Sequence, residues 1–127
     1  MRRLLLDTEA LIWWDDDDPK LGPDARDAIR NADDVYVSAA SAWEIVIKKT
    51  LGKLRTTRRP ADAVSDGGFR TLPVSFEHAE AVAGLIQHHS DPFDRLIIAA
   101  ATVEGLTVLS SDEKFRLYPI PLVDARR

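Results

Sequence analysis

The chain has 127 residues, of which 45% are hydrophobic and 30% charged, so it can bury an apolar core and has the composition of an ordinary globular domain. It contains no cysteine, which excludes disulfides, thiolate metal sites and a cysteine nucleophile. The net charge of −4 argues against a protein that coats nucleic acid by bulk charge, but it does not exclude a nuclease whose acids hold a cation.

Apolar runs along the chain are short compared with the length that a membrane span needs. Asp7 and Glu9 interrupt the apolar start of the chain before it reaches the length of a secretory signal. We therefore expect a cytoplasmic protein without membrane contact, folded as one domain over residues 1–127.

The hydrophobic pattern predicts strands that alternate with helices. The predicted strands span residues 2–6, 35–38, 71–74, 106–109 and 120–123. The predicted helices span residues 8–14, 23–31, 39–50, 60–66, 75–87 and 92–104, with a helical turn over 111–115. Ser38 or Ser41 is expected to cap the third helix, and Asp91 the sixth, whose first position is Pro92. Gly105 is expected to end that sixth helix.

Strands and helices in alternation indicate an α/β fold with a mostly parallel sheet. In such sheets, ligands bind beyond the carboxyl ends of the strands. Asp7 and Asp112 lie just past the carboxyl ends of two predicted strands, and Glu44 and Asp94 lie in the opening turns of two predicted helices. We expect these four carboxylates to converge at one edge of the sheet.

Clustered carboxylates repel one another unless a cation holds them, and a set without histidine or cysteine suits Mg²⁺ or Mn²⁺ better than zinc. Such an ion can activate water against a phosphodiester. We assign Asp7 and Asp94 as direct ligands and Glu44 as a ligand or as the group that orients the water. Asp112 is assigned as a ligand of a second metal or as one that acts through water.

Polar neighbours of these acids are candidates for supporting roles. The hydroxyls of Thr8, Ser38 and Ser111 are expected to orient the acids or to bind phosphate, and Arg95 to contact the substrate phosphate. A basic stretch over residues 48–59 is either a solvated face or a further set of RNA phosphate contacts.

Five segments, in this order and at this spacing, carry a resemblance that spans the chain: Leu5-Leu6-Asp7-Thr8, Val37-Ser38 with Ser41-Ala42-Trp43-Glu44, Leu51-Gly52-Lys53-Leu54, Asp91 to Ala99, and Leu109-Ser110-Ser111-Asp112. With them the chain resembles the PIN-domain ribonucleases, and among these the VapC toxins of VapBC toxin–antitoxin pairs. Two departures are Glu9, where a small or amide residue is common, and Ser111, where threonine or asparagine is common.

The resemblance implies a three-layer α/β/α fold and an endoribonuclease that needs Mg²⁺, for which Mn²⁺ can substitute. By position, the acidic quartet of the family falls on Asp7, Glu44, Asp94 and Asp112. The resemblance also implies a homodimer, an RNA substrate and a cognate VapB-type antitoxin protein that occludes the site.

Each acid also has a structural interpretation. Asp7 and Asp112 can cap the elements that follow them, and Asp94 can interact with the dipole of its helix. Glu44 can form a surface ion pair with Lys48, four residues further along the helix. Asp91 is expected to be a cap rather than a ligand.

The histidines are not expected to bind metal. His78, His88 and His89 have no second histidine or acid at ligand spacing on a predicted helix face, so a core or surface position is expected. A substrate contact by His88 or His89 stays open, as does a contribution of Glu9 to the site.

Other enzyme classes fit the sequence less well. A phosphatase of the haloacid dehalogenase type needs a second aspartate at position 9, where Glu9 stands. A receiver domain needs an acid pair after its first strand and an aspartate at the end of a middle strand, where Ser38 stands. The remaining alternative is a PIN-like module that binds RNA or protein without cutting, for which the loss of an acid would be the sign.

Overall fold

A computed structural model describes residues 2–56, 58–86 and 90–127, so His88 and His89 lie outside the described residues. The strands are β1 (Arg3–Leu6), β2 (Asp34–Ser38), β3 (Arg70–Leu72), β4 (Thr107–Ser110) and β5 (Leu122–Asp124). The α-helices are α1 (Thr8–Asp15), α2 (Pro23–Asn31), α3 (Ala39–Thr50), α4 (Pro60–Gly67), α5 (Phe76–Ala81) and α6 (Pro92–Glu104). Two 3₁₀ helices complete the chain: η1 (Val82–Gly84) and η2 (Glu113–Leu117).

The sheet has five strands in the order β3-β2-β1-β4-β5, and every neighbouring pair is parallel. This confirms the expected parallel sheet, with β1 at its centre. Leu4, Leu5 and Leu6 of β1 are fully buried, as a strand covered on both faces requires. The last strand, β5, is an edge strand as predicted, and Pro121 directly precedes it.

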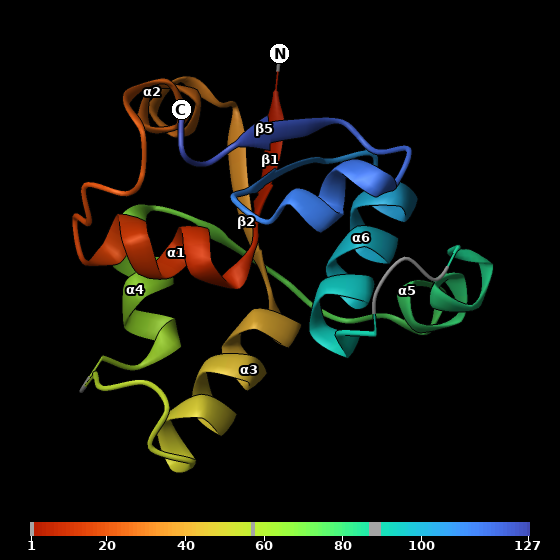
Figure 1. The fold of residues 1–127 in the computed structure, drawn as a ribbon, viewed down its shortest axis with the longest axis horizontal. Coiled ribbons are helices and arrows are strands. Elements are labelled where there is room, and N and C mark those ends of the chain that lie inside the picture. The colour runs from red at the N-terminus through yellow and green to blue at the C-terminus, as the bar shows by residue number, and fades with distance from the viewer. Residues whose placement is uncertain (1, 57, 87–89) are drawn as a thin grey trace.

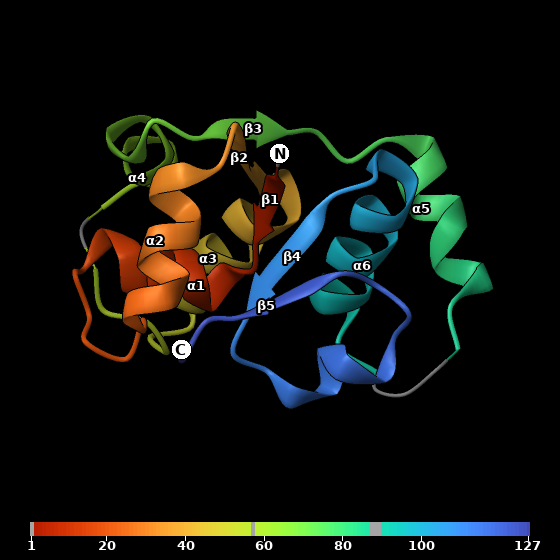
Figure 2. The same cartoon turned by 90° about the horizontal axis from the view of Figure 1, so that it is seen from above.

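Helices cover both faces of the sheet, which confirms the three-layer α/β/α architecture (Figure 2). Because side chains alternate along a strand, Leu4 and Leu6 face one side, where residues of α1, α2 and α4 complete the core. Leu5 faces the other side and packs in a cluster with Ile97 and Ile98 of α6. The strand β1 thus joins the two halves of the core.

Helix starts follow the capping signals. The Ser38 hydroxyl accepts a hydrogen bond from the Ala40 amide at 3.0 Å and so caps α3. The Asp91 carboxylate accepts hydrogen bonds from the amides of Phe93 and Asp94, which confirms it as the cap of α6. The predicted starts at residues 23, 39, 60 and 92 all agree with the structure.

Two predicted elements end earlier than expected. The helix predicted over residues 75–87 ends at Ala81 and continues only as η1, because Leu85 is extended after Gly84; residue 87 lies outside the described residues. The strand predicted over residues 71–74 spans residues 70–72, since Pro73 has no amide hydrogen for the ladder. In the described ranges no helix is long and apolar enough to cross a membrane.

Gly105 is one of the glycines whose backbone conformation favours a residue without a Cβ atom. It ends α6 with φ +68°, a left-handed conformation that costs an L-residue about 1 kcal/mol or more. We expect Gly105→Ala to lower the free energy of unfolding by about 1 kcal/mol in urea denaturation. Gly84→Ala is the matched control, because a Cβ atom added there meets no other atom within 4 Å and the φ of Gly84 is not left-handed. Equal losses in both variants would contradict this reason.

Candidate active site

A cavity of about 380 Å³ lies at the carboxyl ends of β1 and β4. The first turns of α1, α3 and α6 come together there (Figure 1). All four predicted acids line this cavity, which is bounded by Asp7, Thr8, Glu9, Ile12, Trp13, Glu44, Lys48, Lys53, Leu54, Asp91, Asp94, Ser111 and Asp112. The structure therefore brings together carboxylates that are up to 105 residues apart in the chain (from position 7 to position 112).

Asp7 is the innermost of these acids, with 5% of its surface exposed. It caps α1, where its Oδ1 accepts a hydrogen bond from the Ala10 amide at 2.8 Å. Its Oδ2 accepts a hydrogen bond from the Ser110 hydroxyl at 2.6 Å. Burial raises the pKa of Asp7 to about 6 although both hydrogen bonds oppose the shift. The expected capping role of Asp7 and its place in the cavity are thus both present.

Glu44 is also buried, and each of its carboxylate oxygens has a partner. The Thr8 hydroxyl donates to Oε1 at 2.5 Å, and the Lys48 ammonium lies 2.9 Å from Oε2. Thr8 Oγ1 is also 3.0 Å from the Ser41 hydroxyl. Because the single Thr8 proton goes to Glu44, Ser41 is the donor in that second bond. The ion pair between Glu44 and Lys48, which the sequence offered as a purely structural role for Glu44, is present. Both of its residues line the cavity, so the pair does not exclude a role for Glu44 in the site.

Asp94 lies in the first turn of α6 and is half-buried. Its pKa is raised to about 8, first by burial and then by the negative charges of Asp91, Asp7, Glu44 and Asp112. These acids are therefore close enough to repel one another. A group of carboxylates in this state is stabilised by an added positive charge.

Asp112 caps η2 by accepting a hydrogen bond from the Lys114 amide at 2.9 Å. Its own amide donates to the Ser110 hydroxyl at 3.0 Å. Ser110 therefore joins Asp112 to Asp7 through one oxygen. The register of β4 on β1, with Leu109 opposite Leu6, places Ser110 beside Asp7.

The remaining predicted residues divide into two groups. Thr8 and Ser111 line the cavity. Ser38 is buried as the cap of α3 and is not part of the cavity wall. Arg95 is not part of the wall either, because its guanidinium donates to the Tyr118 hydroxyl at 3.4 Å and to the Val82 carbonyl at 3.3 Å.

His78 is a core residue, as expected. It is 2% exposed, and its Nε2 lies 3.0 Å from Glu104 Oε2. Its Nδ1 accepts a hydrogen bond from the Ser75 amide, so Nε2 carries the proton and donates to Glu104. Glu9 is exposed but does line the cavity.

The sequence pattern assigned no role to Ser110, considered Ser41 only as an alternative helix cap, and included Lys53 only in the basic stretch over residues 48–59. Ser110 and Ser41 hold the Asp7 and Thr8 side chains, and Lys53 lines the cavity from the loop after α3. A signal existed for Ser110, since it ends a strand that pairs in parallel with the strand before Asp7. The contact between Ser41 and Thr8 depends on how α3 packs against α1, which no local pattern encodes.

The donor chemistry fits a hard divalent cation. Among the residues that the structure describes, the polar groups that line the cavity are carboxylates, hydroxyls and two lysines, with no imidazole. Burial and mutual repulsion raise the pKa of Asp7 and Asp94. In the part of the chain that the structure describes, no three acidic or imidazole groups are already arranged to hold one ion. The oxygens of Asp7 and Glu44 instead accept from Ser110, Thr8 and Lys48.

Comparisons with known proteins agree on one family. The PIN domain profile matches residues 4–120. Ribonuclease VapC22 of Mycobacterium tuberculosis is 30% identical over 128 aligned positions, which cover 95% of each chain.

Solved structures show the same fold at lower identity. DNA-bound VapBC of Salmonella typhimurium has a TM-score of 0.71 at 21% identity and covers 98% of both chains. VapBC2 of Rickettsia felis, bound to a fragment of its promoter DNA, has a TM-score of 0.68 at 16% identity and covers 96% of this chain and 98% of its own.

The raised pKa of Asp94 predicts how pH acts on the metal-free fold. Between the ordinary value of 3.8 and about 8, the unfolded chain ionises this carboxyl while the folded chain keeps it protonated. The free energy of unfolding should therefore fall as the pH rises through this window. Asp94→Asn should reduce that fall in urea denaturation with chelator present, although Asp7 still contributes at lower pH. An unchanged pH dependence in the variant would show that the pKa of Asp94 is not raised in the folded chain.

Proposed function

The chain belongs to the PIN-domain family, and from this premise we propose that it is an endoribonuclease that acts as the toxin of a type II toxin–antitoxin pair. The convergence of Asp7, Glu44, Asp94 and Asp112 on one cavity carries the proposal. The family profile and a ribonuclease relative at 30% identity support it. The alternative of a non-cutting PIN-like module would be favoured by a missing acid, and the quartet is intact.

Mg²⁺ is the proposed cofactor, with Mn²⁺ able to substitute. Asp7 and Asp94 would hold it directly, with Glu44 and Asp112 as ligands or as partners through water. When bound, the ion supplies Lewis acidity toward the phosphodiester and neutralises the charge of the acids. The carboxylate oxygens of the cavity are ligands that suit Mg²⁺ and Mn²⁺. The crowding of these carboxylates also favours an added cation.

The polar partners of the acids keep them in place for this reaction. Ser110 fixes the orientation of Asp7 through a 2.6 Å hydrogen bond, and Thr8 fixes Glu44. Glu44 has one oxygen at Thr8 and the other at Lys48, so its carboxylate is held in one orientation. An oriented carboxylate can position an attacking water by hydrogen bonding.

A VapB-type antitoxin and a second copy of the chain are the proposed protein partners. Structural neighbours of this fold include VapBC toxin–antitoxin complexes, which supports an antitoxin partner. Exposed aromatic surface supports a protein contact in general: Trp43 is 62% exposed, and its ring lies 5.4 Å from that of Phe93. Residues 1–127 are proposed to act as one domain in these complexes.

Cleavage of RNA by the purified, antitoxin-free chain tests the function. We expect discrete fragments from total cellular RNA with Mg²⁺ or Mn²⁺ and none with chelator. Asp94→Asn should slow cleavage by about 100-fold or more, because it removes a carboxylate ligand. Asp62→Asn is the matched control, since Asp62 also lies in a first helical turn but pairs with Arg59 on the surface. Metal-independent cleavage, or equal rates in both variants, would contradict the proposal.

Metal binding is a separate prediction. Isothermal titration of the wild type with Mn²⁺ should show binding that Asp7→Asn and Asp94→Asn each weaken by about 10-fold or more. Asp62→Asn should bind Mn²⁺ as the wild type does. Wild-type affinity in the Asp7 and Asp94 variants would overturn the assignment of these ligands.

A further inference from the structure

The cavity has a basic side as well as an acidic one. Lys48 and Lys53 line it together with the carboxylates. Lys48 is paired with Glu44 at 2.9 Å, which raises the pKa of its ammonium. Lys53 is exposed, and among the residues that the structure describes it has no ion pair. An exposed ammonium beside a group of acids, yet paired with none of them, is available to a ligand.

The backbone turn after α3 brings Lys53 to the cavity. Gly52 has φ +71°, which reverses the chain, and the Lys53 amide donates to the Lys48 carbonyl at 2.8 Å. The two lysines are thereby joined at the end of α3. Leu54, the next residue, lines both this cavity and an adjoining small apolar groove between α1, α3 and α4.

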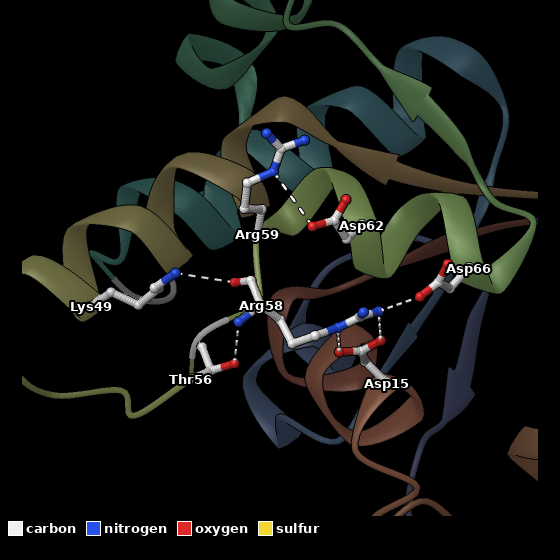
Figure 3. Close-up of polar contacts among 7 residues, drawn as sticks. All are labelled: Asp15, Lys49, Thr56, Arg58, Arg59, Asp62 and Asp66. Atoms are coloured by element: carbon white, nitrogen blue, oxygen red, sulfur yellow. Dashed lines mark hydrogen bonds and ion pairs between the residues drawn. The ribbon is translucent and has the colours of Figure 1, made fainter.

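Arg58 anchors the far end of this loop (Figure 3). Its guanidinium binds both oxygens of Asp15 on α1, with Nε to Oδ2 at 3.2 Å and Nη2 to Oδ1 at 2.9 Å, and also binds Asp66 on α4 at 2.7 Å. Its carbonyl accepts a hydrogen bond from the Lys49 ammonium at 3.1 Å, and its amide donates to the Thr56 hydroxyl. One arginine thus ties the loop that carries Lys53 to α1, α3 and α4.

We propose that Lys53 binds the RNA phosphate backbone on the basic side of the cavity, where Lys48 is paired with Glu44, and that Arg58 is a positioning residue that holds Lys53 there. This inference rests on the proposed ribonuclease function and adds the residues that hold the substrate. The site takes a backbone phosphate of RNA of any sequence, because an ammonium contacts a phosphate without reading the base.

Electrostatics supports a dedicated phosphate site. The chain has a net charge of −4, so an RNA backbone is repelled unless local positive charge offsets the acids of the cavity. These acids are Asp7, Glu9, Glu44, Asp91, Asp94 and Asp112. A bound divalent cation neutralises only part of this charge. Lys48 compensates Glu44, which leaves Lys53 as the cavity lysine for the substrate.

The test uses RNA binding rather than cleavage. The probe is a fluorescent single-stranded RNA with 2′-O-methyl groups throughout, titrated with the full chain and Mg²⁺ over a range of salt concentrations. Loss of one phosphate contact should reduce the slope of log affinity against log salt by about 0.7. Lys53→Gln should show this reduction and weaker binding at low salt, and Lys20→Gln, whose lysine pairs with Asp18 instead, should not.

Arg58 is tested through a double-mutant cycle. Arg58→Gln should weaken RNA binding alone but add little in the Lys53→Gln background, since it acts through Lys53. Arg30→Gln, which removes a surface pair with Asp27, is the matched control. Every variant should still bind Mn²⁺, which would show that the fold and the acidic side of the cavity are intact. Additive losses from Arg58→Gln and Lys53→Gln would overturn the positioning role.

The outcomes of these experiments distinguish a failure of the phosphate site from a failure of the proposed ribonuclease function. A wild type that cleaves RNA, with a Lys53→Gln variant of unchanged salt slope and affinity, would overturn the phosphate site and leave the lysine to an acidic protein partner. A wild type that binds Mn²⁺ but neither binds nor cuts RNA would overturn the ribonuclease proposal, and the phosphate site with it.

Discussion

The buried carboxylate of Asp7 is the group on which the rest of the site depends. It ends the central strand, caps α1 through the Ala10 amide and accepts a hydrogen bond from Ser110 of the neighbouring strand. A charge at 5% exposure is costly unless hydrogen bonds or a cation compensate it. The hydrogen bonds offset only part of this cost, because burial still raises the pKa of Asp7 to about 6. The carboxylate that follows the central strand is thus also one that an added positive charge would stabilise.

Much of the fold is predictable because its signals are local. Uninterrupted apolar strands, Pro23, Asp91-Pro92 and Gly105 each constrain the backbone at their own position, and the helices they delimit have the expected bounds. The strand order is not predictable in this way, since pairing β1 with both β2 and β4 depends on contacts between distant residues. The early end of α5 is not predictable from the sequence either. It depends on the extended backbone of Leu85, and no capping residue in the sequence signals it.

The acids of the site follow from their place at strand ends and helix starts, whereas their partners do not. Ser111 and Ser110 are adjacent, but they face different sides of the chain, and only the register with β1 shows that Ser110 contacts Asp7. Asp94 and Arg95 are adjacent too. Successive helical side chains point in directions about 100° apart, so one lines the cavity and the other contacts Tyr118. Whether a residue lines the cavity therefore depends on the direction of its side chain, and this direction is set by packing.

The partnership of Asp7 with β4 also bears on when the activity arises during synthesis. Asp7 and Ser110 are 103 residues apart, and β4 is the fourth of five strands to leave the ribosome. A nascent chain that stops before residue 107 carries three of the four acids but has no strand on that side of β1 to position Asp7. Because every strand pairing is parallel and non-local, the cavity closes only late in folding. A ribosome-bound fragment that ends before β4 would therefore lack both the strand pairing and the hydrogen bond that hold Asp7 in place.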